Sequence, residues 1–354
     1  MNGQKRLRDY GIIIGKLETG KRNAITDVEG VTVGHATLNN KDTQTGVTAI
    51  IPHQGNIFKE KVIAASHVIN GFGKTMGLMQ ITELGTIETP ILLTNTLSIG
   101  VTADALIEYM LEHNEDIGRT TGTVNPIVCE CNDMFLNDVR ARKITKDHVF
   151  GAIANASAEF DEGSVGAGRG MLCYSLKGGI GTSSRIIHME HGSYTIGVLA
   201  LTNFGTLSDL VIAGNPIGQQ LKKQLTQTNK DKDKGSVIII VATDLPVSER
   251  QLNRIIKRAV TGLSRTGSII TTGSGEVVIG FSTATKIPHE NPYSSVPISA
   301  IHEEDIDVAF RAVGEATEEA VLNSLITATH VIGRDGNERP ALKDLLREYN
   351  IHLL

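Results

Sequence analysis

The chain has few aromatic residues and few cysteines, and it lacks tryptophan altogether. Only 4% of its 354 residues are aromatic, whereas 37 residues are glycine. The core must therefore be packed from Ile, Val, Leu and Ala, with many glycine turns between the elements. The three cysteines, Cys129, Cys131 and Cys173, are too few for the disulfide framework of a small secreted domain.

Long apolar runs are also lacking. The N-terminal stretch from Met1 to Lys16 contains only a short apolar run, Ile12 to Ile14, which is too short for the core of a signal peptide. No stretch approaches the roughly 18 consecutive apolar residues of a membrane-spanning helix. The formal net charge of -5 gives no basis for binding nucleic acid or an anionic membrane. We therefore expect a cytoplasmic protein without nucleic-acid or membrane partners.

Segments typical of helices and of strands alternate along the chain, without internal repeats. From its length alone the chain could form one large domain or two. Apolar runs, most of them rich in β-branched residues, predict strands at 90–97, 125–131, 194–202, 237–241 and 276–281. Helices are predicted at 60–77, 102–113, 248–267 and 306–329, the third with the capping-box spacing of Ser248 and Gln251. This alternation predicts a layered α/β sandwich.

Two glycine-rich segments resemble phosphate-binding loops but lack the required spacing. Gly71 to Thr75 reads GFGKT, yet the residue five positions before Gly73 is Val68, where a phosphate-binding loop needs glycine. Gly166 to Gly170 reads GAGRG and lacks the glycine spacing of a dinucleotide-binding loop. Neither segment predicts a nucleotide site.

The histidines and cysteines do not form a convincing metal-binding pattern. His188 and His191 have no third ligand nearby in the sequence, so two surface histidines are favoured over a metal site. Cys129 and Cys131 lie two positions apart on a predicted strand and therefore face the same way. Because there is no second cysteine pair, core packing is favoured over zinc. We expect no metal and no cofactor.

The sequence changes character abruptly at Gly235 and Ser236. The preceding segment 219–234, QQLKKQLTQTNKDKDK, has the composition of a mobile surface loop, and the most strand-like run of the chain, VIIIV at 237–241, follows directly. From spacing alone, the Gly-Ser pair is a turn before a strand. The pair also suits self-cleavage, because a serine attacks the preceding carbonyl only from a backbone conformation that glycine adopts easily.

Five long segments carry a resemblance to a known family. They read NAITDVEGVTVGHATL at 23–38, NGFGKTMGLMQITELGTIETPILLTNTLSIGV at 70–101, GSVGAGRGMLCYSLKGGIGTSSR at 163–185, GSVIIIVATDLP at 235–246 and GSGEVVIGFSTA at 273–284. The sequence resembles the L-aminopeptidase/D-Ala-esterase-amidase and β-peptidyl aminopeptidase family nearly end to end. The resemblance implies a four-layer αββα sandwich and a single domain over 1–354. It also implies self-cleavage into an α chain, 1–235, and a β chain, 236–354, with assembly as a tetramer of cleaved protomers.

The resemblance assigns the catalytic residues one at a time. The nucleophile of the family falls on Ser236, which becomes N-terminal after the cut behind Gly235. The family's second serine and its glutamate fall on Ser274 and Glu276. Independently of the resemblance, two residues spaced i, i+2 in an extended chain point to one side, so this pair can act together. The alternative is a polar turn that enters a strand.

Further positions correspond to the oxyanion and substrate contacts of the family. Asn203, at the end of the strand predicted at 194–202, corresponds to the side-chain donor to the oxyanion, although Asn-Phe-Gly is also an ordinary turn sequence. Glu130 corresponds to the acidic residue that binds the substrate's ammonium, with a structural ion pair as the alternative. Family members can carry a tyrosine shortly after this glutamate, whereas this segment reads ECNDMF. Asn132 or Phe135 must take the place of the tyrosine.

The implied function is that of a self-processing serine aminopeptidase. It would remove the N-terminal residue from short peptides, amino-acid amides or esters through an acyl-enzyme on Ser236. The general base is either the α-amine of Ser236, whose ordinary pKa is about 7.7 to 8.0, or the pair formed by Ser274 and Glu276. One alternative is the ornithine acetyltransferase type, in which threonine is expected at the cut. Another is an uncleaved relative that binds small amines or acts as a scaffold, which the missing tyrosine leaves open.

Overall fold

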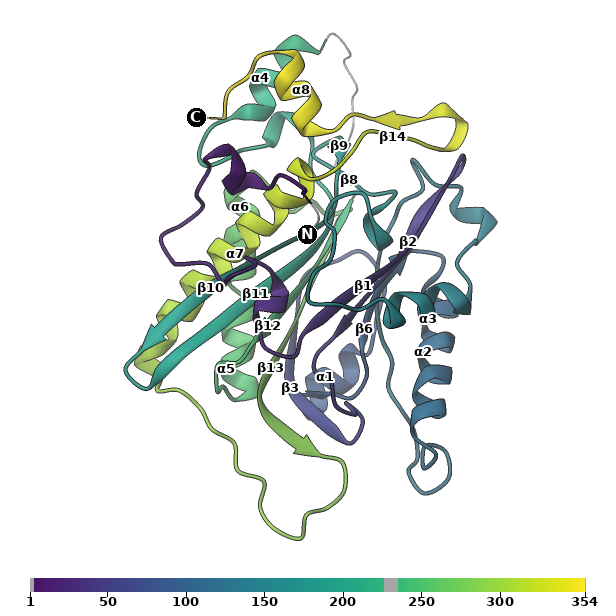
Figure 1. Ribbon diagram of the computed structural model, residues 1–354, viewed down its shortest axis with the longest axis vertical. Coiled ribbons are helices and arrows are strands. Elements are labelled where there is room, and N and C mark those ends of the chain that lie inside the picture. The colour runs from purple at the N-terminus through teal and green to yellow at the C-terminus, as the bar shows by residue number, and fades with distance from the viewer. Residues whose placement is uncertain (1–2, 226–234, 354) are drawn as a thin grey trace.

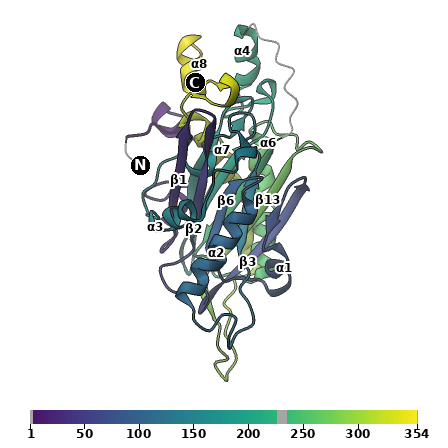
Figure 2. The same ribbon diagram turned by 90° about the vertical axis from the view of Figure 1, so that its right-hand side faces the viewer.

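Two stacked β-sheets lie between two layers of helices in the computed structural model, which describes residues 3–225 and 235–353 (Figure 1). The five-stranded sheet has the strand order β1-β2-β6-β7-β4, and the six-stranded sheet has the order β10-β11-β12-β13-β3-β5. Helices α2 and α3 cover the first sheet, and α5 and α7 cover the second. Figure 2 shows α2 lying over the five-stranded sheet. The predicted αββα sandwich is therefore confirmed.

The bounds of the elements are as follows. The first sheet contains β1 (Thr32–Asn40), β2 (Thr43–Ile51), β6 (Ile91–Asn95), β7 (Ile127–Cys131) and β4 (Thr75–Met76). The second contains β10 (Gly179–Met189), β11 (Gly192–Asn203), β12 (Ser236–Thr243), β13 (Gly275–Pro288), β3 (Glu60–Gly71) and β5 (Thr86–Ile87). Two small hairpins are formed by β8 (Leu172–Cys173) with β9 (Leu176–Lys177) and by β14 (Val331–Ile332) with β15 (Glu338–Arg339). The helices are α1 (Leu78–Leu84), α2 (Ile99–His113), α3 (Lys146–Ala154), α4 (Ile217–Gln224), α5 (Glu249–Ile256), α6 (Ala259–Arg265), α7 (Ile306–Ile326) and α8 (Leu342–Glu348).

Strand β12 lies in the centre of the six-stranded sheet and is buried on both faces. Val237 and Ile239 pack in the cluster beneath α5 and α7, whereas Ile238 and Ile240 pack between the two sheets. This double burial explains why the run VIIIV has no polar position. The strand is antiparallel to β11 and parallel to β13.

The helix predicted at 60–77 is wrong, because residues 60–71 form strand β3. Val62 and Ala64 face the space between the sheets, and Ile63 and Ala65 face the helices. Over 62–65 the side chains thus alternate between two apolar environments, so no polar position in that part of the strand reveals the two-residue period. Strand β3 pairs with β13 in antiparallel register.

Two other predicted segments differ from the structure in detail. The helix predicted at 248–267 is divided into α5 and α6, although the capping box is confirmed by the hydrogen bond of 3.3 Å from the Gln251 N–H to the Ser248 Oγ. The polar segment 219–234 begins within α4, because Ile217 and Leu221, four residues apart, are buried on one side of that helix. The rest of that segment, at 226–234, lies outside the described residues. The other predicted strands and helices are confirmed with shifts at their ends, the largest in β13, which extends to Pro288 instead of ending at 281.

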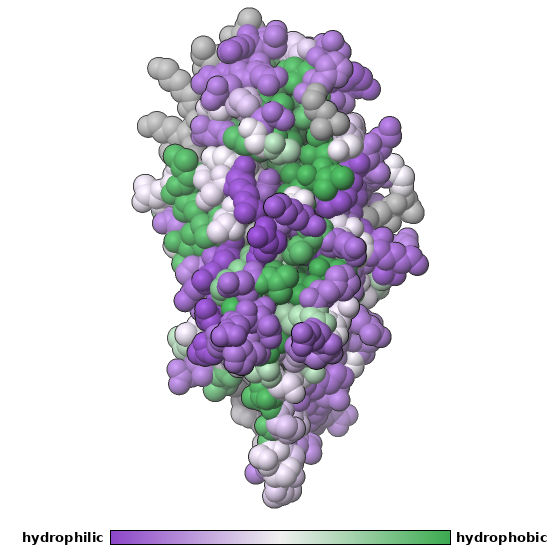
Figure 3. Space-filling view, turned by 90° about the vertical axis from the view of Figure 1, so that its left-hand side faces the viewer, coloured by the Kyte–Doolittle hydropathy of each residue, from purple (hydrophilic) through white to green (hydrophobic). Residues whose placement is uncertain are grey.

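Among the described residues, no helix has the length and hydrophobicity needed to span a bilayer. Figure 3 shows the side of the molecule that carries the N-terminal segment, where hydrophilic side chains separate several apolar patches.

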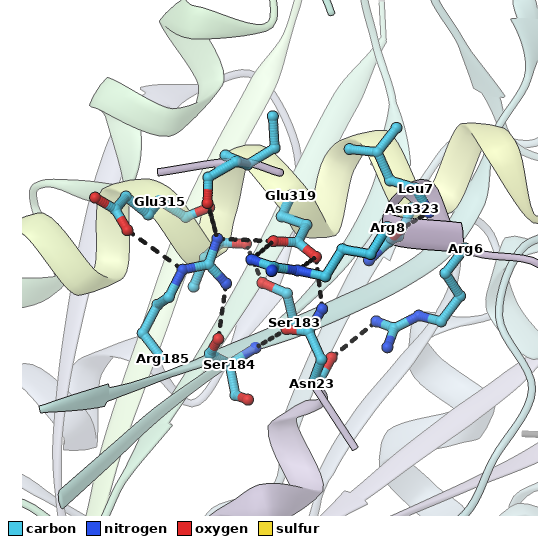
Figure 4. Close-up of polar contacts among 12 residues, drawn as sticks. Arg6, Leu7, Arg8, Asn23, Ser183, Ser184, Arg185, Glu315, Glu319 and Asn323 are labelled. Carbon is cyan, nitrogen blue, oxygen red and sulfur yellow. Dashed lines mark hydrogen bonds and ion pairs between the residues drawn. The ribbon is translucent and has the colours of Figure 1, made fainter. Parts of the chain in front are cut away.

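A buried ionic cluster attaches the N-terminal segment to α7 and β10 (Figure 4). The Arg185 Nη2 lies 2.7 Å from the Glu319 Oε2, and both side chains are fully buried. The Arg185 Nε is 3.3 Å from the Glu315 Oε2, and the Arg8 Nε is 2.8 Å from the Glu319 Oε1. Burial alone would raise the pKa of Glu319, but the Arg8 hydrogen bond and the Arg185 charge lower that pKa overall.

We expect Glu319→Gln to lower the free energy of unfolding by about 3 to 5 kcal/mol, because it removes the fully buried carboxylate that pairs with the Arg185 Nη2. Glu60→Gln is the control, since the ion pair of Glu60 with Lys286 is about half exposed and contributes at most about 1 kcal/mol. Chemical denaturation at pH 7 measures both variants.

The same comparison tests the pKa of Glu319. Because the native pKa is lowered, the carboxylate contributes its full stabilisation above the pKa of the unfolded chain. The contribution is lost as the pH falls through the native pKa, so the difference between wild type and Glu319→Gln should shrink at acid pH. A difference that stays constant down to acid pH contradicts the assignment.

Candidate active site

Ser236 is the first residue of β12 and lies between the ends of two neighbouring strands. Its Cα is paired with that of Asn203, the last residue of β11, and with that of Gly275, the first residue of β13. Residues directly opposite each other on neighbouring strands point to the same side, with Cβ atoms about 4.5 to 5.5 Å apart. The side chains of Ser236 and Asn203 therefore meet on one face of the sheet.

The backbone N–H of Gly275 has two acceptors on the neighbouring strand. It lies 3.2 Å from the carbonyl oxygen of Gly235 and 3.3 Å from the Oγ of Ser236. The Gly235 carbonyl belongs to the peptide bond that joins Gly235 to Ser236. One donor therefore polarises this carbonyl and also holds the hydroxyl of the following residue.

Close approach of the backbone requires glycine at positions 235 and 275. A Cβ at Gly235 would lie 1.7 Å from the carbonyl oxygen of Asn203, and one at Gly275 would lie 2.3 Å from that of Phe72. Neither glycine has a left-handed φ. Glycine is therefore required at position 235 because the Asn203 carbonyl leaves no room for a Cβ, and not because of the conformational freedom expected from the sequence.

Ser274 and Glu276 are buried on either side of Gly275. The Ser274 Oγ donates a hydrogen bond to the Glu276 Oε1, so the two side chains lie together as their spacing predicts. The Ser274 main-chain carbonyl accepts a hydrogen bond from the Asn70 side chain at the end of β3. This contact fixes the turn that leads into β13.

The carboxamide of Asn203 is held at both ends by main-chain groups. Its Oδ1 accepts a hydrogen bond of 2.9 Å from the Leu172 N–H, and its Nδ2 donates one of 3.1 Å to the Asn132 carbonyl. Because one neighbour is a donor and the other an acceptor, the orientation of the amide is determined. The Asn132 contact uses one of the two Nδ2 hydrogens.

Glu130 is buried at the end of β7 and has a lysine as its partner. Its Oε1 accepts hydrogen bonds from the Lys74 backbone N–H at 2.9 Å and from the Lys74 Nζ at 3.3 Å. The Lys74 Nζ also lies 2.7 Å from the Thr96 Oγ1, and about half of this lysine side chain is exposed. The GFGKT segment, which lacks the spacing of a phosphate loop, thus lies at the candidate site.

The two residues predicted to replace the tyrosine have different surroundings. Asn132 adjoins Asn203 through its carbonyl group. The Phe135 ring packs instead against the guanidinium of Arg339, whose central carbon is 3.8 Å from the ring centroid, and the Phe135 carbonyl accepts a hydrogen bond from Asn337. These contacts attach Phe135 to the region of the hairpin β14–β15. Of the two residues, Asn132 is therefore the one that contacts a predicted catalytic residue, Asn203.

Comparison with known proteins shows the family. The sequence model described as peptidase family S58 matches residues 23–339. The chain belongs to peptidase family S58. It is therefore a peptide-bond hydrolase, and the family favours an aminopeptidase over a small-amine binder.

The relatives extend over almost the whole chain. The β-peptidyl aminopeptidase BapA of Sphingosinicella xenopeptidilytica is 37% identical, with 93% of this chain and 86% of that protein covered. The PH0078 protein of Pyrococcus horikoshii OT3 is 49% identical with a TM-score of 0.91, over 98% of this chain and 99% of that chain. The L-aminopeptidase D-Ala-esterase/amidase of Ochrobactrum anthropi, described as a variant of the Ntn-hydrolase fold, is 33% identical with a TM-score of 0.87 over 99% of both chains.

Within the described part of this S58 peptidase, no group of three or more His, Cys, Asp or Glu side chains is arranged to hold a metal ion. The side chains of all three cysteines are buried. Burial raises the pKa of the Cys129 thiol to about 12, so this side chain stays protonated and unreactive at neutral pH. The cysteines pack in the core, as the sequence analysis favours for Cys129 and Cys131.

The sequence analysis missed an aspartate next to the site. Asp133 follows Asn132 and is almost completely buried, and its Oδ1 accepts a hydrogen bond of 3.0 Å from the Asn137 side chain. Burial raises the pKa of Asp133 to about 7, although hydrogen bonds from Thr45 and Asn137 oppose this shift. A sequence motif does not reveal this position, because its burial depends on distant segments.

We expect Asp133→Asn to change the pH dependence of stability. Between the ordinary pKa near 3.9 and the native value of about 7, native Asp133 keeps a proton that the unfolded chain has lost. The free energy of unfolding therefore falls as the pH rises through this range, by at most about 1.4 kcal/mol per pH unit. The free energy of unfolding of Asp133→Asn minus that of wild type should therefore be larger at pH 8 than at pH 5. Thermal unfolding at the two pH values measures this, and an equal difference at both contradicts it.

Proposed function

We propose that the chain is made as a precursor that cuts itself between Gly235 and Ser236, and that Ser236 is then the nucleophile of the aminopeptidase. The observation that carries this proposal is the Gly275 N–H, 3.2 Å from the Gly235 carbonyl oxygen and 3.3 Å from the Ser236 Oγ. A donor at a carbonyl oxygen favours attack on its carbon, because it stabilises the negative charge that develops on that oxygen.

In the first reaction, the Ser236 Oγ attacks the Gly235 carbonyl carbon as the hydroxyl loses its proton. The bond from this carbon to the Ser236 nitrogen then breaks, and the nitrogen takes up a proton to become an amine. Water hydrolyses the resulting ester and leaves a carboxylate on Gly235. The products are the chains 1–235 and 236–354 within one folded domain.

The α-amine of Ser236 is available as a base in only one of the two reactions. Before the cut, the Ser236 nitrogen is part of an amide and is not basic, so the pair of Ser274 and Glu276 assists the attack. After the cut, Ser236 has a free α-amine, a group with an ordinary pKa of about 7.7 to 8.0, and this amine can also act as the general base. The buried hydrogen bond between Ser274 and Glu276 supports this assignment, because the pair adjoins the residue that contacts the nucleophile.

In the second reaction, the substrate's ammonium binds Glu130 and displaces the Lys74 ammonium from it. Ser236 attacks the carbonyl carbon, and the second Nδ2 hydrogen of Asn203 stabilises the oxyanion. The amine or alcohol leaves, and water hydrolyses the acyl-enzyme. The names of the relatives cover β-peptides, L-amino acids and D-Ala esters or amides. Such compounds share an amine near the acyl carbon, which supports short peptides, amides or esters as the substrates of this chain. Asn132, whose carbonyl contacts Asn203, would lie beside the bound substrate.

Two further expectations stay predictions. The tetramer of cleaved protomers rests on the family resemblance, and the cytoplasmic location rests on the sequence analysis.

We expect Ser236→Ala to abolish self-cleavage and to lower aminopeptidase activity by about a thousandfold or more. Intact mass under denaturing conditions should show two species for wild type, the smaller beginning at Ser236, and one species of 38.0 kDa for the variant. The control is Ser295→Ala, an exposed serine in a loop, which should be cut like wild type. A Ser236→Ala protein that still cuts itself and hydrolyses aminoacyl amides rules the proposal out.

We expect Glu130→Gln to raise KM for an aminoacyl amide about tenfold or more, because a hydrogen bond to a charged group is worth about 1.5 to 3 kcal/mol. Lys74→Met is the matched variant and should lower KM, since it removes the ammonium that competes for Glu130. Steady-state kinetics on cleaved protein measures both. If the two variants change KM in the same direction, Glu130 does not bind the substrate's ammonium.

A further inference from the structure

Lys177, the last residue of β9, is fully buried, and its ammonium donates to three main-chain carbonyls. Its Nζ lies 2.9 Å from the Gly168 oxygen, 2.8 Å from the Met171 oxygen and 2.7 Å from the Gly178 oxygen. Three acceptors match the three hydrogens of an ammonium, whereas a neutral amine has only two. A charge in the interior is costly, so this arrangement calls for a role beyond packing.

Two opposing effects act on the charge of this side chain. Burial lowers the pKa of the Lys177 ammonium well below its ordinary value, and the nearby Arg169 charge acts in the same direction. The three carbonyl oxygens favour the charged form, because each accepts a hydrogen that the neutral amine could not supply to all three. The hydrogen-bond geometry therefore describes an ammonium.

One peptide group connects Lys177 to Asn203. The Met171 carbonyl accepts hydrogen bonds from the Lys177 Nζ at 2.8 Å and from the Gly178 N–H at 3.0 Å. The N–H of the same peptide group, on Leu172, donates to the Asn203 Oδ1 at 2.9 Å. Because an amide is conjugated, a cation at its oxygen makes its N–H a stronger donor, and hydrogen bonds in a chain strengthen one another. The Asn203 carboxamide is conjugated in the same way, so a stronger hydrogen bond to its Oδ1 makes its Nδ2–H groups stronger donors.

The hairpin that carries Lys177 is held in a strained conformation. Tyr174 and Ser175, which join β8 to β9, have left-handed φ values of 51° and 61°. Such values are unfavourable at residues other than glycine and persist where the surrounding structure enforces them. Here the Tyr174 hydroxyl lies 2.8 Å from the Thr266 Oγ1, and the Tyr174 ring packs edge-on against Phe204. The tight turn returns the chain so that Lys177 reaches the Met171 carbonyl.

We infer that Lys177 is a positioning residue for the oxyanion donor: through the Met171–Leu172 peptide group it orients the Asn203 carboxamide and strengthens its Nδ2 as a donor. This inference rests on the proposed function, in which Asn203 stabilises the oxyanion. Lys177 itself does not touch the substrate. Its effect belongs to the transition state, where charge develops on the substrate oxygen, so it should change kcat and leave KM almost unchanged.

The test is a double-mutant cycle with Lys177→Met and Asn203→Ala, measured on aminoacyl p-nitroanilides. Rates are divided by the amount of free N-terminal Ser236, counted by intact mass, so that incomplete self-cleavage does not distort them. We expect Asn203→Ala to lower kcat about a hundredfold. Lys177→Met should lower kcat about tenfold with KM within about twofold, since it weakens the donor without removing it. The double variant should equal Asn203→Ala within about twofold.

Tyr174→Phe is the matched control, because it removes the hydroxyl contact with Thr266 from the same hairpin, whereas the ring packing against Phe204 that holds the turn, and with it the Lys177 contacts, remains. Its kcat should stay within about twofold of wild type even where its melting temperature falls. If Lys177→Met does not fold, Lys177→Gln removes the charge while retaining one donor group, and it enters the same cycle.

Each outcome separates the inference from the proposed function. If Asn203→Ala lowers kcat but Lys177→Met lowers it equally in both backgrounds, or not at all, Lys177 acts independently of Asn203 and the inference is wrong. If Asn203→Ala leaves kcat unchanged, the oxyanion role proposed for Asn203 fails, and the inference fails with it. A loss confined to the background that contains Asn203 supports both.

Discussion

The pairing of β12 with β11 and β13 is the constraint on which the candidate site depends. It sets Ser236 opposite Asn203 on one side and Gly275 on the other. A shift of one residue in this register would turn Ser236 to the opposite face of the sheet. The Asn203 carbonyl on β11 lies so close to position 235, and the Phe72 carbonyl behind β3 so close to position 275, that only glycine fits at either position. The strand register, the two glycines and the proposed nucleophile Ser236 are therefore parts of one arrangement.

Main-chain groups orient most of the polar side chains in this arrangement. The Leu172 N–H and the Asn132 carbonyl hold Asn203, and the Lys74 N–H contacts Glu130. Main-chain groups in a packed sheet neither titrate near neutral pH nor change rotamer. They supply electrostatic stabilisation that requires little reorganisation during the reaction. A site built in this way depends on the strands and loops behind it, which is why a hairpin as distant in sequence as β8–β9 bears on Asn203.

The sequence predicted the elements whose signals are local. The apolar run at 237–241, the capping box at Ser248 and the side-by-side placement of Ser274 and Glu276 each depend on residues within a few positions of one another. Strand β3 was mistaken for a helix because burial on both faces hides its period. The contacts of Lys74 and Gly275 were missed because they join segments far apart in the chain through main-chain atoms. No side-chain pattern records such a contact.

The two proposed reactions place their carbonyl groups differently around one nucleophile. In the precursor, the Gly235 carbonyl is directed toward β13, since it accepts from the Gly275 N–H. The proposed oxyanion donor of turnover, Asn203, is on β11, which lies on the other side of β12. In this proposal, self-cleavage and substrate hydrolysis use hydrogen-bond donors on the two opposite neighbours of strand β12. One sheet can therefore hold a peptide bond ready for a single cut and still retain an oxyanion donor for the substrates that follow.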